Sequence, residues 1–146
     1  MAFNKRFLQG KYTPKNPHKY VGDLNKIVYR SSYELQMHRF LDNNERVLRW
    51  SSEQVIIPYL KPTDNKIHRY FPDYWCEYVT KEGEILQEII EVKPKTQTRA
   101  PRVNSKRRMY EQVTLAINIA KWKAADAFCK QHNMKFRIIT ERSVFK

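Results

Sequence analysis

Two strand-like runs joined by a short turn place the tightest constraint on how this chain can fold. Residues 67–80 are rich in aromatic and β-branched side chains, and residues 84–93 form a second strand-like run. Residues 81–83, Lys-Glu-Gly, end in the residue type that tolerates the positive φ of a three-residue hairpin loop. The pattern therefore predicts an antiparallel hairpin with Thr80 opposite Glu84.

This register predicts that two carboxylates converge. Counting back from the turn, Asp73 lies opposite Glu91, and directly opposed side chains share a face with Cβ atoms about 5 Å apart. Because strand side chains alternate, Lys93 points to that face as well. Like charges at this distance repel unless one carboxylate takes a proton or a cation lies between them. We therefore expect Asp73, Glu91 and Lys93 to surround a cation.

A divalent cation at that place would have a definite chemistry. Carboxylate oxygens are the ligands that Mg²⁺ and Mn²⁺ prefer. Between a water molecule and a phosphate, such an ion lowers the pKa of the water and neutralises charge on the phosphate oxygens. Lys93 would orient or deprotonate the water, or hold the phosphate. The combination is typical of phosphodiester hydrolysis. The alternative is a turn aspartate after Pro72 and two solvated strand charges.

The rest of the pattern predicts one α/β domain with a mixed sheet over residues 31–146, preceded by an extended basic arm over residues 1–30. The arm carries seven Lys or Arg residues and one acid. Apolar residues recur at helical spacing in two later segments. In chain order we expect the arm, a helix over about 32–44, a strand over 53–59, the hairpin, a helix from 105 to about 133 and a strand over 136–140.

The charge of the chain favours a polyanionic partner. There are 28 Lys and Arg residues against 15 Asp and Glu residues, a formal net charge of +13. Nucleic acid is the first candidate and an anionic membrane the second, but no apolar run approaches the roughly 20 residues of a membrane span. Two cysteines, Cys76 and Cys129, provide neither a disulfide framework nor a zinc site. We expect a cytoplasmic protein that binds DNA and needs no membrane or small-molecule cofactor.

We expect the arm and residues 94–108 to bind the backbone of double-stranded DNA. Residues 94–108 hold six basic residues, two prolines and no acid, and they follow Lys93 directly. Contacts to backbone phosphates carry no sequence information, so we expect low sequence specificity. Taken singly, each cation has the alternative of being a solvated charge. Lys121 on the second helix either points toward the site or is a solvated lysine. The residues expected to contact phosphates are Lys95, Arg99, Arg102, Lys106, Arg107 and Arg108.

The hairpin residues also carry a resemblance. Pro72-Asp73 followed, after seventeen residues, by Glu91-Val92-Lys93 resembles the PD-(D/E)-x-K nuclease superfamily. The resemblance implies a restriction-endonuclease-like α-β-β-β-α-β core, which agrees with the expected order of elements. It further implies that Asp73, Glu91 and the Val92 carbonyl bind Mg²⁺ or Mn²⁺, and that Lys93 is the catalytic lysine.

In that superfamily a helix before the sheet often supplies another acid, and Glu34 matches it here. Glu34, Met37 and Leu41 lie on one side of the first expected helix, where an unpaired charge is costly. The resemblance makes Glu34 a supporting catalytic acid and metal ligand. The alternative is a capping box with Ser31, and we expect one carboxylate not to fill both roles. His38, one turn later, either packs or contacts metal-bound water or DNA.

A closer resemblance extends over almost the whole chain. Residues 7–14, 29–34, 71–75 and 120–123 resemble the head completion nucleases of large contractile-tailed bacteriophages. The same core is similar to the endonuclease that nicks transposon ends. The resemblance implies endonuclease and exonuclease activity on packaged DNA before tail attachment, with phage head, portal or neck proteins as partners. The protein would then lie in the cytoplasm of the infected cell or in the virion.

Two other classes of function stay open. The first is a non-catalytic, basic DNA-binding structural protein of the virion, in which the carboxylates are remnants. The second is a basic accessory domain that binds RNA.

Overall fold

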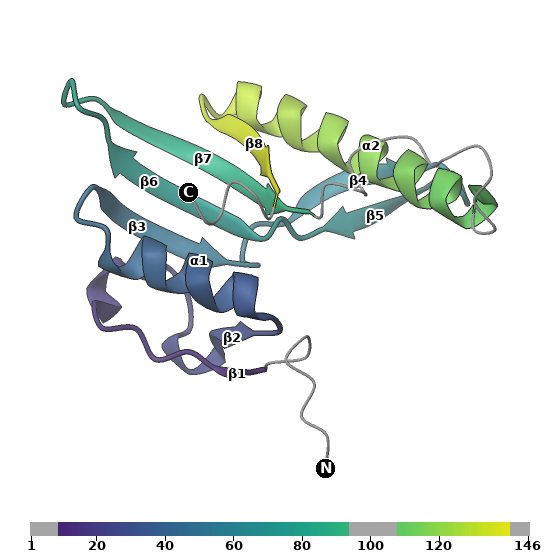
Figure 1. Ribbon diagram of the computed structural model, residues 1–146. Coiled ribbons are helices and arrows are strands. Elements are labelled where there is room, and N and C mark those ends of the chain that lie inside the picture. Colours follow the sequence, from purple (N-terminus) through teal and green to yellow (C-terminus); the bar gives the residue numbers. More distant parts are fainter. Residues whose placement is uncertain (1–8, 94–107, 141–146) are drawn as a thin grey trace, which may run out of the picture.

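The structure, a computed structural model, describes residues 9–93 and 108–140 (Figure 1). Its centre is a four-stranded mixed sheet, flanked by two helices and two small two-stranded sheets. The elements are β1 (Gly10–Lys11), the 3-10 helices η2 (Pro17–Lys19) and η3 (Leu24–Lys26), β2 (Val28–Tyr29), α1 (Ser32–Asn43), β3 (Val47–Ser52), β4 (Ile57–Lys61), β5 (Lys66–Tyr70), β6 (Tyr74–Val79), β7 (Ile85–Val92), α2 (Arg108–Gln131) and β8 (Lys135–Ile139).

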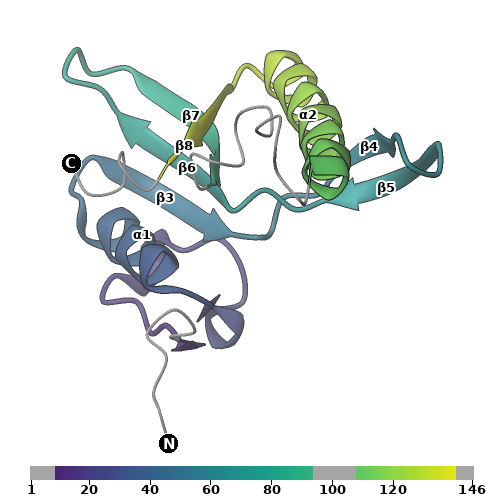
Figure 2. The ribbon, with the colours of Figure 1, turned by 45° about the vertical axis from the view of Figure 1, so that its right-hand side comes forward.

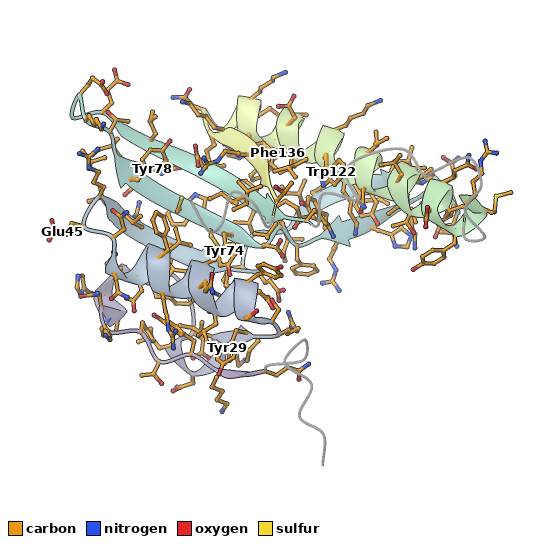
Figure 3. All side chains as sticks on the ribbon, viewed as in Figure 1. Tyr29, Glu45, Tyr74, Tyr78, Trp122 and Phe136 are labelled. Atoms are coloured by element: carbon orange, nitrogen blue, oxygen red, sulfur yellow. The ribbon has the colours of Figure 1, made fainter. Side chains whose placement is uncertain are left out.

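The central sheet has the order β3-β6-β7-β8, and the two helices pack on opposite faces of it (Figure 2). On β7, Ile90 belongs to the apolar cluster to which α1 contributes Met37 and Leu41. The neighbouring Ile89 points to the other face, because strand side chains alternate. Its partner in β8, Phe136, packs with the α2 side chains (Figure 3). Side chains of both layers can therefore meet only at an edge of the sheet.

The predicted hairpin is confirmed in its register and in its turn. Strands β6 and β7 pair antiparallel with Tyr74 opposite Ile90, as counting back from the turn predicts. The Thr80 N–H donates to the Glu84 carbonyl across 2.8 Å, and Gly83 has a φ of 85°. Glycine adopts this left-handed conformation without steric cost, so the loop itself sets which side chains oppose each other.

The run over residues 67–80 is not one strand, which corrects the expectation. It divides into β5 and β6 at residues 71–73, with the buried Pro72 at the centre of the break. Proline has no N–H to donate to a neighbouring strand and its φ is fixed, so the chain leaves one sheet there and enters another. Strand β5 pairs with β4 in a separate hairpin, whereas β6 joins the central sheet.

The expected strand over residues 53–59 is also wrong in its position. The first strand of the central sheet is β3, which contains the fully buried Trp50, and β4 begins only at Ile57. Between the two strands Glu53 has a φ of 54°, a conformation that no strand residue adopts. Strand β3 was not predicted from the sequence, because Arg49 and two serines interrupt its apolar pattern.

Both expected helices and the closing strand are confirmed. Helix α1 begins after Ser31, whose Oγ accepts a hydrogen bond from the Glu34 N–H across 3.2 Å. Helix α2 is described from Arg108 onward, and residues 105–107, where the expected helix begins, lie outside the described residues. Strand β8 runs parallel to β7. Within residues 9–93 and 108–140, neither helix is apolar and long enough to cross a membrane.

Residues 9–30 differ from the expected extended arm, since they fold onto α1 and β3. Tyr12, Tyr20 and Ile27 are buried in the same cluster as Trp50. The carboxylate of the fully buried Asp42 accepts hydrogen bonds from the Tyr12 hydroxyl (2.7 Å) and from the backbone N–H groups of residues 15 and 16 (2.7 and 3.0 Å). This packing was not predicted from the sequence, because the aromatic side chains of this basic segment are spaced irregularly.

Candidate active site

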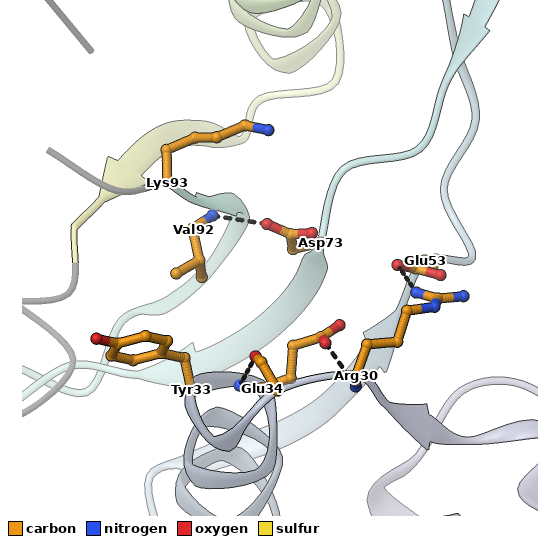
Figure 4. Close-up of a pocket in the computed structure, with 8 residues that line it drawn as sticks. Arg30, Tyr33, Glu34, Glu53, Asp73, Val92 and Lys93 are labelled. Carbon is orange, nitrogen blue, oxygen red and sulfur yellow. Dashed lines mark hydrogen bonds and ion pairs between the residues drawn. The ribbon is translucent and has the colours of Figure 1, made fainter. Parts of the chain in front are cut away.

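A pocket opens where the end of β7 meets the start of α1 (Figure 4). Four separate parts of the chain form it, namely the residues before and at the start of α1, the residue after β3, the residue before β6, and the end of β7. The pocket therefore lies at the α1 side of the sheet edge. It is lined by Arg30, Ser31, Tyr33, Glu34, Glu53, Asp73, Val92 and Lys93.

Asp73 and Glu91 come together as the hairpin register predicts. Oδ2 of Asp73 accepts a hydrogen bond from the Val92 N–H across 2.7 Å. Glu91 is only 4% exposed, and its Oε2 accepts a hydrogen bond from the Tyr70 hydroxyl across 2.5 Å. Burial and then the hydrogen bond and negative charge of Glu91 raise the pKa of Asp73 well above its usual range. In the absence of a cation, Asp73 therefore keeps its proton at neutral pH.

Lys93 follows the last residue of β7 and is half-buried. Its N–H donates to the Ile139 carbonyl across 2.9 Å, which fixes the backbone at this point. The side chain extends past Asp73 in Figure 4, and its positive charge acts against the rise in the pKa of Asp73. The structure therefore brings all three residues of the predicted charged group to one place.

Glu34 lines the pocket while taking part in the cap of α1. Its Oε2 accepts a hydrogen bond from the Arg30 N–H across 2.7 Å, one residue before the position that a capping box would use. Burial raises the pKa of Glu34. The capping box with Ser31 is therefore not formed as expected, since the carboxylate bonds the residue before Ser31, and whether Glu34 also serves as a catalytic acid stays a prediction.

Glu34 nevertheless stands apart from the acidic pair. Among the described residues, no three His, Cys, Asp or Glu side chains are gathered closely enough to hold a metal ion. The reason is positional, since Glu34 is held on α1 by Arg30 whereas Glu91 is turned towards Tyr70. The described residues thus offer a pair of carboxylates of which Asp73 lines the pocket and Glu91 lies behind it, with Glu34 on another wall of the pocket.

Comparison with known proteins places this geometry in a family. Residues 44–141 match the model of the TnsA-like endonuclease N-terminal domain. The chain belongs to the TnsA-like endonuclease family. It is also 40% identical over 139 residues to the head completion nuclease of Enterobacteria phage T4, an alignment that covers 90% of each chain. The match to the TnsA-like domain contains Asp73, Glu91 and Lys93 and begins after Glu34.

The fold of the TnsA-like endonuclease domain is restriction-endonuclease-like, as the sequence predicted. The order α1-β3-β6-β7-α2-β8 corresponds to the α-β-β-β-α-β core, and the β4–β5 hairpin is an insertion between its first two strands. The mixed α/β class is confirmed. The separate hairpin supplies Tyr70, which reaches Glu91 from outside the core.

Two residues of the pocket were missed by the sequence analysis, Arg30 and Glu53. The Nη1 of Arg30 lies 2.6 Å from Oε1 of Glu53, across 23 positions of sequence. The Glu53 N–H donates to the carbonyl of Asp73 across 3.1 Å. Nothing in the local pattern indicated this pair, because Arg30 was assigned to the arm and Glu53 to a strand.

Lys121 points towards the site, which favours the first of its two alternatives. Its amine lies 5.6 Å from the ring centre of Tyr70 and 5.8 Å from that of Tyr59, in cation–π geometry. Burial lowers the pKa of Lys121, and the nearby charge of Lys93 lowers it further. A half-buried lysine on α2 is thereby held near the acidic pair.

Six cations were predicted to contact DNA phosphates. Arg108 is the exposed first residue of α2, and the other five lie outside the described residues, namely Lys95, Arg99, Arg102, Lys106 and Arg107.

His38 is fully buried, with Nε2 at 2.9 Å from the Val28 carbonyl and Nδ1 at 2.8 Å from the Tyr74 hydroxyl. Tyr74 lies between α1 and the sheet (Figure 3), so His38 joins these layers instead of contacting water or DNA.

Proposed function

We propose that this protein is a metal-dependent endonuclease that hydrolyses phosphodiester bonds of double-stranded DNA with low sequence specificity. The observation that carries the proposal is the buried pair of carboxylates, Asp73 and Glu91, beside the amine of Lys93. The family model and the phage relative are both named for nuclease activity, which supports it. The net charge of +13 suits a polyanionic substrate.

The donor set fits Mg²⁺ or Mn²⁺. Burial and the neighbouring Glu91 raise the pKa of Asp73, so Asp73 is protonated without a cation, and a divalent ion would replace that proton. Asp73, Glu91 and the Val92 carbonyl would hold the ion, with Glu34 as the supporting acid from α1. When bound, such an ion lowers the pKa of a water molecule and neutralises charge on phosphate oxygens.

The residues of the chain position the remaining groups. Hydrolysis joins a water oxygen to phosphorus and breaks one ester P–O bond, while the water loses a proton and the departing oxygen gains one. Lys93, which lines the pocket together with Asp73, would orient the water or hold the phosphate. Tyr70 keeps the Glu91 side chain in one orientation through its 2.5 Å hydrogen bond. The residues that would bind the DNA backbone are Lys95, Arg99, Arg102, Lys106, Arg107 and Arg108.

The phage relative supports a proposal for the biological role. The name head completion nuclease, carried by a protein 40% identical to this one, supports a role on packaged phage DNA during head completion and head–tail joining. Phage head, portal or neck proteins would then be partners, and the site of action would be the cytoplasm of the infected cell or the virion. Exonuclease activity at exposed DNA ends belongs to the same proposal.

Nicking of supercoiled plasmid tests the proposed activity. The wild type should nick with Mg²⁺ or Mn²⁺ and not with EDTA, and Asp73→Asn, Glu91→Gln and Lys93→Met should each lose about 100-fold or more in rate. Glu84→Gln, an exposed acid on the same hairpin, is the matched control and should nick normally. Variants as active as the wild type would reject the site. A wild type that binds DNA without cleaving it with any divalent ion would indicate a structural DNA-binding protein.

A further inference from the structure

The pocket has a cation on each side of Asp73. Lys93 approaches from the end of β7, and Arg30 lies on the far side of Asp73 from Lys93 (Figure 4). The acids between them, Glu34, Glu53 and Asp73, would by themselves repel a phosphate. A nuclease pocket that contains these three acidic side chains therefore needs cationic groups where the DNA strand enters and leaves, because they offset the repulsion of its phosphates.

Arg30 is held in place at two points. Its backbone N–H donates to Oε2 of Glu34 across 2.7 Å, and its Nη1 donates to Oε1 of Glu53 across 2.6 Å. The Arg30 side chain is still 56% exposed. The guanidinium group is therefore oriented by the protein while remaining reachable from the solvent side of the pocket.

Glu53 connects Arg30 to the segment that carries the acidic pair. Its N–H donates to the Asp73 carbonyl across 3.1 Å, while its carboxylate bonds Arg30. Its φ of 54° directs the side chain away from the path that a continuing strand would take. The position of the guanidinium is thereby tied to the position of Asp73 through a single residue.

A second ion pair in the same chain provides a comparison. Arg49 bonds Glu77 through both Nε (3.1 Å) and Nη2 (2.9 Å), so the carboxylate occupies one edge of the guanidinium fork. The bond between Arg30 and Glu53 runs through Nη1 instead. A guanidinium group has five N–H donors in a planar fork that matches a phosphate, and the Arg30 geometry leaves an edge of that fork for a ligand.

We propose that Arg30 binds a backbone phosphate of the DNA strand in the pocket, opposite Lys93, and that Glu53 is a positioning residue that holds its guanidinium group. The inference rests on the proposed nuclease function and adds a phosphate-binding residue to it. The role is specific to a guanidinium group, because a lysine at position 30 would keep the charge but lack the planar fork of donors that can bond Glu53 and a phosphate at the same time.

Steady-state cleavage and DNA binding test this role together. We expect Arg30→Ala to lower kcat/KM about 100-fold and Arg30→Lys and Glu53→Gln about 10-fold. Binding of a labelled DNA duplex in EDTA should weaken for Arg30→Ala, with the slope of log K against log salt reduced by about one. The matched controls Arg49→Ala and Glu77→Gln should stay within about twofold of the wild type in both measurements. Thermal unfolding of each variant checks that it is folded.

The outcomes separate this inference from the nuclease function. Normal binding and cleavage by Arg30→Ala would overturn it, as would equal losses in Arg30→Ala and Arg49→Ala. If the wild type does not cleave but Arg30→Ala still loses affinity relative to Arg49→Ala, the phosphate site stands and the nuclease function fails. Unlabelled duplex should displace the labelled DNA. Displacement by inorganic phosphate at equal phosphate concentration would overturn the assignment to a DNA strand.

Discussion

The hydroxyl of Tyr70 donates a 2.5 Å hydrogen bond to Oε2 of Glu91, although the two residues belong to different sheets. Burial and the charge of Glu91 raise the pKa of Tyr70, so the hydroxyl keeps its proton at any working pH. Strand β5 thus ends on a donor that serves a carboxylate of β7. The inserted β4–β5 hairpin is by this contact a part of the site and not an appendage.

Tyr70→Phe should therefore lower both stability and activity. It removes a donor from a buried carboxylate, which costs about 1–3 kcal/mol of the free energy of unfolding. Free rotation of Glu91 should lower the nicking rate about 10-fold. Tyr59→Phe removes a hydroxyl from the neighbouring ring and is the control. Urea denaturation and plasmid nicking measure the two effects, and equal behaviour of the two variants would contradict the role given to Tyr70.

Divalent metal should raise the melting temperature of the wild type. A ligand that binds the folded state alone stabilises it by about 2.7 kcal/mol at a concentration of about 100 times its Kd. Asp73→Asn and Glu91→Gln should abolish the shift in melting temperature, because each replaces a negatively charged metal ligand by a neutral amide. Without metal the same variants should melt at or above the wild-type temperature, since an amide at either position removes the cost of taking up a proton at Asp73 on folding at pH 7. A shift that persists in both variants would place the metal elsewhere.

Lys121→Met should weaken cleavage by about 10-fold, because it removes a cation that lies over two tyrosine rings close to the acidic pair. Lys123→Met, two positions further along α2 and exposed, is the control and should change the rate less than twofold. Single-turnover rates with excess protein separate a loss in chemistry from a loss in DNA affinity. Equal effects of the two substitutions would show that only the total charge matters.

Asp42→Asn should lower the free energy of unfolding at pH 7 by about 1–3 kcal/mol. The asparagine NH2 group would replace a carboxylate oxygen that accepts hydrogen bonds from the Tyr12 hydroxyl and from backbone N–H groups, and a donor cannot accept them. Burial alone would raise the pKa of Asp42, but these hydrogen bonds lower it below its ordinary value. The stabilisation is complete above the unfolded-state pKa of about 3.9 and is lost as the pH falls through the lower folded-state pKa.

Urea denaturation of the wild type and Asp42→Asn at a series of pH values measures this effect. The difference between them should be constant from pH 7 to about pH 5 and shrink below about pH 4. Asp126→Asn, which loses only an exposed ion pair with Lys130, should match the wild type throughout. A difference that does not change down to pH 3 would show that Asp42 is not the titrating group.

The sequence alone determined the features that depend on neighbours along the chain. The hairpin register, and with it the meeting of Asp73 and Glu91, followed from a three-residue loop ending in Gly83, since a turn sets pairing locally. The helix start at Ser31 and the length of the second helix likewise followed from short-range patterns.

Only the tertiary structure decided which distant segments meet. Asp42 holds Tyr12 across 30 positions, and Arg30 meets Glu53 across 23, so neither pair leaves a periodic trace in the sequence. The sequence pattern did not show that Pro72 would divide residues 67–80 into two strands, nor that β5 would leave the central sheet and return Tyr70 to Glu91. Such contacts arise when separate elements bury their apolar faces together, and that packing depends on the whole chain at once.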